Sequence, residues 1–246
     1  FFDLKVVPVL VIIFVLLFLL ETKLALRKMF QPRFKRIVLN SVISIPAFTL
    51  LRFLFLPAMV WLASTNLQLQ VGLNYLYSLP SWVECVIAFL LLDYGNYLWH
   101  HLNHRIPFLW RYHLVHHTDP DLDITSAFRF HFGEMIGSLI FRGAFVFLSG
   151  ASPLLVLIYE VVFEAATQFH HANLKLPIKL ERLLNLVFVT PRMHGIHHSI
   201  VKEETDSNYA VIFSCWDRIH NTIRLNVPQQ MVTTGVPSYN EPGELT

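Results

Sequence analysis

The sequence predicts an all-α integral membrane protein. We expect a helical bundle of about four spanning elements, including a helical hairpin, with a histidine-rich, di-metal cap on the cytosolic side. Hydrophobic residues make up 54% of the 246-residue chain and charged residues only 15%, whereas soluble domains usually contain ~25% charged residues. Long apolar runs alternate with short polar segments, and most of the 13 histidines fall into three clusters at helical spacing.

The N-terminal third predicts two membrane segments and their orientation. Residues 6–20 form an uncharged apolar run, and residues 37–63 form a second run that contains Pro46, Pro57 and Arg52. Because a basic stretch follows the first run, we expect a retained membrane helix rather than a cleaved signal peptide. Residues 21–36 are rich in Lys and Arg, whereas residues 64–82 carry no charge. The positive-inside rule therefore places 21–36 in the cytoplasm and 64–82 on the opposite side.

The following elements return the chain to the cytoplasmic side. We predict a third helix over residues 83–104 and an interfacial or cytoplasmic helix over residues 108–123. Two apolar helices over 134–149 and 153–172 should form a hairpin, because the stretch from Ser149 to Pro153 contains Gly and Pro. Residues 1–225 read as one domain, since the three histidine clusters must meet to form one site, and residues 226–246 read as a polar C-terminal tail.

Three histidine boxes carry the chemistry. Residues three and four apart share a face of an α-helix, so each box directs its imidazoles to one side. Neutral imidazole is a ligand for iron, zinc and copper. A structural zinc site takes four ligands, and the boxes hold more histidines than one such site can use. We therefore predict two metal ions. The boxes are His100-x-x-x-His104, His113-x-x-His116-His117 and His194-x-x-His197-His198.

Further residues are candidates for the same site. Asp93 shares a helix face with His100, and we assign it to the catalytic site as a carboxylate that orients a ligating imidazole. His171 shares a face with Glu160 and Glu164, and ionisable groups within a membrane span are costly unless they face the interior. The alternative for these two acids is an interhelical hydrogen bond, for example to Arg142. The predicted metal ligands are His100, His104, His113, His116, His117, His131, His171, His194, His197 and His198.

The order of the boxes and their surroundings resemble the fatty acid hydroxylase/sterol desaturase superfamily of membrane-bound di-iron oxidases, in particular its bacterial sterol desaturase branch. The resemblance covers roughly residues 20–225. The chain departs from the family at His101 and His170, where Arg and Asn are usual, so the ninth and tenth ligands stay open. The matching stretches are Asp93-Tyr-Gly-Asn-Tyr-Leu-Trp-His100, Leu109-Trp-Arg-Tyr-His113, Phe169-His-His-Ala-Asn173, Thr190-Pro-Arg-Met-His194, Glu204-Thr-Asp-Ser-Asn-Tyr209 and Trp216-Asp-Arg218.

Membership of this superfamily implies two iron ions as cofactors and O₂ as co-substrate, although overexpression could load zinc instead. It implies hydroxylation or desaturation of a sterol, fatty acyl or related lipid drawn from the bilayer. It also implies a separate electron donor, either a ferredoxin or a cytochrome b5-type protein with its reductase. We expect the protein in a bacterial inner membrane, with the boxes on the cytoplasmic side and access for the lipid near Phe14, Phe48 and Leu91.

Two other functions fit the same residues. A zinc-dependent membrane hydrolase could use the same imidazoles, and so could a non-catalytic metal-binding or transport protein. Transport is disfavoured because the histidines gather at one face instead of lining a path across the bilayer. A formal net charge of +2, without a basic and aromatic stripe, gives no sign of nucleic-acid binding. H-E-x-x-H, G-x-G-x-x-G and P-loop patterns are absent from the sequence.

Overall fold

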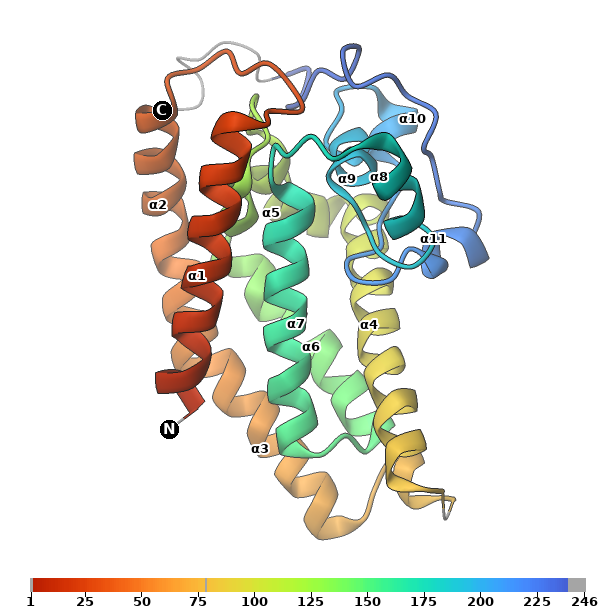
Figure 1. The fold of residues 1–246 in the computed structure, drawn as a ribbon. Helices are drawn as coiled ribbons and strands as arrows, with labels where there is room; N and C mark the ends of the chain where they lie inside the picture. The colour runs from red at the N-terminus through yellow and green to blue at the C-terminus, as the bar shows by residue number, and fades with distance from the viewer. Residues whose placement is uncertain (1, 78, 239–246) are drawn as a thin grey trace.

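The computed structural model of the protein describes residues 2–77 and 79–238, and its long elements are all helices (Figure 1). α1 (Phe2–Lys23) rises to the end of the bundle that carries the cap, and α2 (Arg33–Leu50) runs back beside it. Within the described residues, β-pairing is limited to isolated bridge pairs. The predicted all-α membrane bundle is therefore confirmed.

The second apolar segment is one long, bent helical stretch. α2 passes through a π-helical turn, Leu51–Phe55, into α3 (Leu56–Leu69), which crosses obliquely beneath the bundle (Figure 1). Proline lacks the N–H of a regular helix and its ring crowds the preceding turn, so Pro46 and Pro57, on either side of the π-helical turn, account for the bend. At ~1.5 Å per residue the whole stretch is about 55 Å long, more than the ~30 Å of a bilayer core.

Four more helices complete the bundle and lead to the histidines. α4 (Ser81–Arg105) rises towards the cap and α5 (Pro107–His117) follows it directly. α6 (Phe132–Ser149) and α7 (Pro153–His171) form the predicted hairpin. Gly150, with φ of 71°, ends α6 in the left-handed conformation that glycine adopts easily. The Ser152 side chain then accepts a hydrogen bond from the backbone N–H of Leu155 and caps α7.

The remaining chain folds over one end of the bundle as a cap. Its short helices are α8 (Ile178–Leu184), α9 (Pro191–His197), α10 (Lys202–Thr205) and α11 (Cys215–Ile219), which gather on the same side (Figure 1). Glu21, at the end of α1, joins the bundle to this cap because its Oε2 accepts hydrogen bonds from the backbone N–H groups of Ile124 and Asn173.

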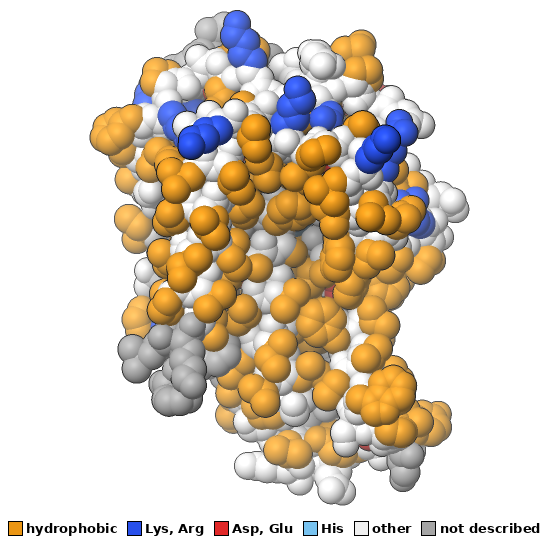
Figure 2. All heavy atoms as spheres, in the orientation of Figure 1, with side chains coloured by type: hydrophobic (Ala, Val, Ile, Leu, Met, Phe, Trp, Pro, Cys, Tyr) orange, Lys and Arg blue, Asp and Glu red, His pale blue; other side chains and the backbone are white. Residues whose placement is uncertain are grey.

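The outer surface of the bundle is that of a membrane protein. Three helical stretches are long and apolar enough to cross a bilayer: Val6–Lys23, Arg33–Tyr75 and Phe132–Ser149. Large hydrophobic side chains such as Phe53 (77% exposed) and Ile140 (74% exposed) point outwards from them. Figure 2 shows hydrophobic side chains over most of one face of the bundle, with Lys and Arg confined to the cap end.

One expectation differs from the structure. The helix predicted over residues 108–123 is wrong beyond His117, where α5 ends. Pro120 disfavours helical backbone at the residue before it, and the chain continues as a loop to a 3₁₀ helix, Ile124–Phe128. Part of the segment predicted as a polar tail packs on the cap: Thr234 forms a bridge pair with Ser199, and the Gly235 N–H donates to the carbonyl of His198. Residues 239–246 of the predicted tail lie outside the described residues.

Candidate metal centre

Nine of the ten histidines predicted as ligands meet in two adjoining groups where the bundle joins the cap. In each group, one ring nitrogen of every histidine lies within 4.8 Å of one from each of the others. α4 supplies members of the first group only and α7 supplies a member of the second only, whereas α5 and α9 supply both. The first group is His100, His104, His113, His117 and His197; the second is His116, His171, His194 and His198.

The H-x-x-H-H spacing explains why α5 serves both groups. Successive residues on an α-helix point ~100° apart, while residues four apart share a face. His113 and His117 therefore face the first group, and His116 turns to the second. The ring centroids of His116 and His198 are 4.7 Å apart, and those of His117 and His197 are 4.8 Å apart. The second and third boxes thus meet inside each of the two groups.

An oxygen atom holds the outer nitrogen, Nδ1, of many of these imidazoles. Carbonyl and carboxylate oxygens only accept hydrogen bonds, so Nδ1 must carry the proton, which leaves the Nε2 lone pair free for a metal. The acceptors come from segments far apart in the sequence. Nδ1 of His100 lies 2.7 Å from the carbonyl oxygen of Tyr209, and Nδ1 of His197 lies 2.7 Å from that of Ser207. Nδ1 of His171 lies 2.8 Å from the Thr167 carbonyl oxygen, and Nδ1 of His116 lies 3.3 Å from that of Arg129. Nδ1 of His113 lies 3.0 Å from Oε1 of Glu134.

The inner nitrogens face one another. Nε2 of His171 lies 3.1 Å from Nε2 of His116 and 3.0 Å from Nε2 of His194. Since His116 and His171 both have their proton on Nδ1, the first of these contacts sets two lone pairs against each other. In the first group, Nε2 of His100 and Nε2 of His197 are buried and have no hydrogen-bond partner within the described part of the chain. A cation between the rings is the arrangement that satisfies these atoms.

The protonation states agree with metal binding. Burial lowers the pKa of His197 to about 3, although its hydrogen bond to Ser207 acts in the opposite direction. Burial and the neighbouring imidazoles hold the pKa values of His117 and His198 well below 6.5. These rings are therefore neutral near pH 7, which is the form that binds metals. A nitrogen-rich set of this kind, with no thiolate, fits transition-metal ions such as iron, zinc or copper.

Glu134 is a residue of the site that the sequence did not reveal. It lies in the first turn of α6, it is 6% exposed, and its Oε1 accepts hydrogen bonds from His113 and, at 3.4 Å, from the Asn103 amide. An acidic residue in the first turn of a helix is common, because it interacts favourably with the helix dipole. Its spacing from the second box follows no motif. Nothing in the sequence therefore distinguished an acceptor for His113 from an ordinary acidic residue at the start of a helix.

The structure places Asp93 away from the histidines. Its Oδ2 accepts hydrogen bonds from Nε1 of Trp216 at 2.8 Å and from the Phe213 N–H at 3.2 Å. Among the described residues, no histidine is a hydrogen-bond partner of Asp93. Asp217, on the same segment, accepts from the N–H of Tyr209, whose carbonyl in turn holds His100. Asp93 therefore fastens α4 to the segment of the cap that orients a histidine.

The other candidates have separate places. His131 belongs to neither group; its Nδ1 accepts a hydrogen bond from the Gly133 N–H at 2.9 Å and caps the start of α6. His170, beside His171, is bonded through Nδ1 to the Val211 carbonyl at 3.1 Å. Glu160 forms an ion pair with Arg142, which is the interhelical alternative considered from the sequence.

A buried ionic cluster fixes the loop that follows the second box. Arg36 of α2 is 1% exposed and pairs with Asp119 at 2.8 Å and with Asp123. Arg129, next in this cluster, donates through Nε to the Val115 carbonyl at 2.7 Å. The carbonyl of Arg129 is also the acceptor for His116. Through these contacts the cluster connects the second box to α2. Removal of one member would leave an unpaired buried charge, which is strongly destabilising.

The comparison with known proteins agrees with this arrangement. The profile of the family described as fatty acid hydroxylase matches residues 85–222, a stretch that contains all three boxes. The chain belongs to the fatty acid hydroxylase family. No solved structure matches the chain significantly.

Curated relatives of this family member share the boxed region. The ornithine lipid hydroxylase of Rhizobium tropici is 31% identical over 158 residues, covering 63% of this chain and 45% of the relative. Human alkylglycerol monooxygenase is 30% identical over 162 residues, covering 61% and 33%. Human cholesterol 25-hydroxylase is 28% identical over 142 residues, covering 56% and 50%. The chain thus spans half or less of the length of these three relatives.

Proposed function

We propose that the protein is a membrane-bound di-iron oxygenase that uses O₂ to hydroxylate a lipid. Family membership supports this proposal, and so do the names of the relatives, which are a hydroxylase of ornithine lipid, a hydroxylase of cholesterol and a monooxygenase of alkylglycerol. Those names favour hydroxylation over desaturation. Each of the three substrates they name is a lipid, which agrees with the apolar exterior of this bundle.

One contact carries the proposal: the 3.1 Å separation of the Nε2 atoms of His116 and His171. Both rings donate a proton from Nδ1 to a carbonyl oxygen, so neither has a hydrogen to place between the two nitrogens. A bound cation explains this contact, and an ordinary hydrogen bond does not. The adjoining first group supports a second cation.

When bound, a pair of iron ions supplies the redox chemistry that activates O₂ towards a C–H bond. The overall reaction adds one oxygen atom to the substrate and releases the other as water, so it consumes two electrons and two protons. A separate one-electron carrier, of the ferredoxin or cytochrome b5 class with its reductase, would supply the electrons. The carbonyl and carboxylate acceptors of the chain hold the imidazoles in one tautomer.

The lipid would reach the site from within the bilayer. Phe14 of α1 and Phe48 of α2 both lie against Phe128, with ring centroids 5.5 and 5.4 Å apart. Phe128 ends the 3₁₀ helix that follows the second histidine box. We propose that an acyl or sterol chain passes between α1 and α2 at these rings.

The charge pattern supports a cytoplasmic location for the cap. Exposed cations gather at this end (Figure 2). Lys28 of the linker between α1 and α2, Lys179 of α8 and Lys202 of α10 are all exposed. Two carboxylates of the cap, those of Glu181 and Asp217, are buried and add nothing to the charge of its surface. Excess positive charge marks the cytoplasmic side of membrane proteins, and we propose the bacterial inner membrane as the location.

Lipid analysis under ¹⁸O₂ tests the function. A bacterial host that expresses the protein should accumulate a lipid that carries one heavy oxygen atom, and the His116→Ala variant should not. His101→Gln is the matched control, because His101 lies within the first box along the sequence but belongs to neither group. An oxygen atom that came from water instead of O₂ would indicate a hydrolase and overturn the proposal.

Elemental analysis of the purified protein tests the metal content separately. We expect two metal ions per folded chain, iron in the active enzyme, with zinc as the competitor during overexpression. A content of one metal ion or none per folded chain would contradict the di-metal centre.

A further inference from the structure

We propose that Arg27, in the linker between α1 and α2, is a positioning residue that holds the ligands of the second metal group in place. This inference rests on the metal centre of the proposed function. The linker lies outside the residues matched by the family profile. From the sequence, its basic residues indicated only how the protein is oriented in the membrane. The contacts of Arg27 assign it a second role.

The guanidinium of Arg27 is bound to both sides of the turn that begins α9. Its Nη1 donates to Oε1 of Gln229 at 2.7 Å and to the carbonyl oxygen of Pro191 at 3.4 Å. Gln229 in turn donates from Nε2 to the carbonyl oxygen of Arg192 at 3.3 Å. Arg27 and Gln229 thus clamp the first turn of α9, the helix that carries His194.

The same guanidinium lies directly on the third histidine box. A Cβ atom added to Gly195 would be 2.1 Å from Nη1 of Arg27 and 2.8 Å from its Cζ. Only glycine therefore allows the side chain to rest against the backbone between His194 and His197. A close approach of this kind fixes how far α9 can shift towards the linker.

The backbone of Arg27 is tied to the end of α7, which carries another histidine of the second group, His171. Its N–H donates to Oδ1 of Asn173 at 2.8 Å, and Nδ2 of Asn173 donates back to the Arg27 carbonyl at 2.9 Å. Asn173 follows His171 by two residues. The linker therefore joins the end of α7 to the start of α9, and the Nε2 atoms of His171 and His194 lie 3.0 Å apart.

The burial of Arg27 separates it from the other basic residues of the linker. Its Nε and Nη2 atoms are buried and have no hydrogen-bond partner among the residues that the structure describes. Burial lowers its pKa to about 10, so the group stays charged near pH 7. Lys28, the next residue, is exposed. A cation that served only the orientation in the membrane would be exposed as Lys28 is.

Stepwise removal of metal tests this role without any measurement of turnover. The protein, purified in detergent and loaded with Zn²⁺ alone, is titrated with a chelator while the bound zinc is counted by elemental analysis. In Arg27→Gln we expect one of the two zinc ions to leave at a chelator concentration roughly 10–100-fold lower than in the wild type, as for other groups that orient ligands. The other zinc ion, bound by the first group, should leave at the same chelator concentration as in the wild type.

Three variants sharpen the result. Lys28→Gln removes the same charge from the same linker and should behave as the wild type. Arg27→Lys should recover most of the affinity, because both hydrogen bonds of the guanidinium leave from one nitrogen that an ammonium can replace. Gly195→Ala should reproduce Arg27→Gln, since the new methyl displaces the guanidinium.

Equal weakening of both zinc ions in Arg27→Gln would show general loosening of the fold and would overturn the inference, and so would an unchanged titration. A wild-type protein that binds no zinc at all would instead refute the metal centre of the proposed function. The two failures are therefore distinguishable.

Discussion

Oε1 of Glu134 lies 3.0 Å from Nδ1 of His113, so a carboxylate at the start of α6 orients a ring on α5. Among the described histidines of the two groups, this pair is the one in which the outer nitrogen meets a carboxylate at hydrogen-bond distance; the other acceptors are carbonyl oxygens. A carboxylate makes the imidazole a more basic ligand. The first group therefore contains one imidazole, that of His113, that is more basic than the others.

Removal of this charge should weaken the first group. Glu134→Gln keeps an acceptor for His113 but loses the negative charge, so we expect metal affinity to fall roughly 10–100-fold. Chelator competition on the purified protein measures the change. Glu84→Gln, at the opposite end of the bundle in the first turn of α4, is the control. Equal affinities in the two variants would show that Glu134 has no effect on the ligand.

His131 and His116 should respond differently to truncation. His131→Ala removes the cap of α6 and should lower the free energy of unfolding by ~0.5–2 kcal/mol, the usual range for a lost helix cap, while both metal ions stay bound. His116→Ala should lose metal. Thermal denaturation and elemental analysis of the same preparations measure the two effects. Loss of a metal ion from His131→Ala would show that His131 is a ligand.

Asp93 should affect the stability of the cap more than its metal content. Asp93→Leu leaves the N–H groups of Trp216 and Phe213 without their acceptor, and each unsatisfied buried donor costs about 1–3 kcal/mol. Asp93→Asn keeps one acceptor and should retain both metal ions with a smaller loss. Denaturant titration compares the variants. A loss of metal from folded Asp93→Asn would show that the carboxylate acts on the ligands directly.

The metal-free protein should lose stability in mild acid. The pKa of His197 is lowered to about 3 by burial, whereas the unfolded side chain titrates near ~6.5. Below that value the unfolded state binds more protons than the folded state, so stability is constant above pH ~6.5 and falls as the pH decreases towards 3. Melting temperatures of chelator-treated protein between pH 8 and pH 5 measure this. A flat profile would mean that the rings are protonated in the fold.

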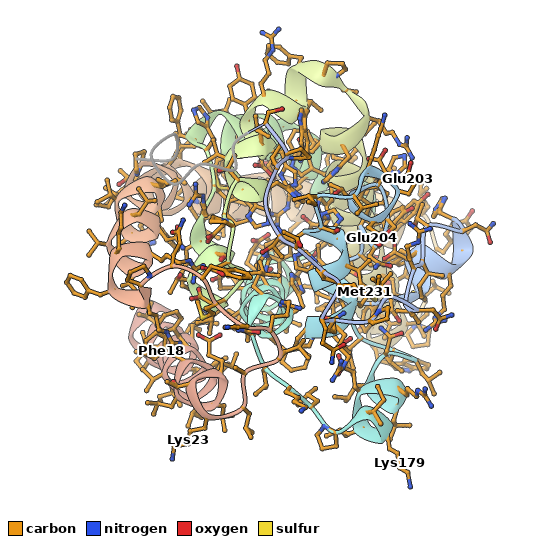
Figure 3. The ribbon with its side chains drawn as sticks, turned by 90° about the horizontal axis from the view of Figure 1, so that it is seen from above. Phe18, Lys23, Lys179, Glu203, Glu204 and Met231 are labelled. Carbon is orange, nitrogen blue, oxygen red and sulfur yellow. The ribbon has the colours of Figure 1, made fainter. Side chains whose placement is uncertain are left out.

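Labelling should place the two ends of the bundle on opposite sides of the membrane. Single cysteines at Asn74, in the 3₁₀ helix between α3 and α4 (Leu73–Tyr75), and at Glu203, on the cap (Figure 3), are introduced after replacement of Cys85 and Cys215. An impermeant thiol reagent added outside intact cells should modify the first and spare the second. Modification of both from one side would refute the arrangement.

The histidine boxes could be predicted because helical spacing is local. Residues three and four apart meet on one face whatever surrounds the helix, so the assignment of His113, His116 and His117 to a common site needed no tertiary information. The hairpin was predictable for the same reason, since Gly150 and Pro153 act on the backbone beside them.

The groups that orient the ligands could not be predicted in this way. Tyr209 and Ser207 hold histidines through carbonyl oxygens, which every residue possesses and which leave no mark in a sequence. Arg27 and Glu134 are common residue types at unremarkable positions, and their partners lie far along the chain. Their roles follow from tertiary contacts alone.

The contacts of Glu21 set an order for assembly in the cell. This carboxylate lies near the end of α1 and is synthesised before α2 to α7, yet both backbone groups that it accepts from, at Ile124 and Asn173, are made much later. Until Asn173 has left the ribosome, α1 cannot dock in its final position. A nascent chain halted before that point should therefore leave α1 free in the bilayer and open to membrane proteases, whereas a chain released after it should be protected.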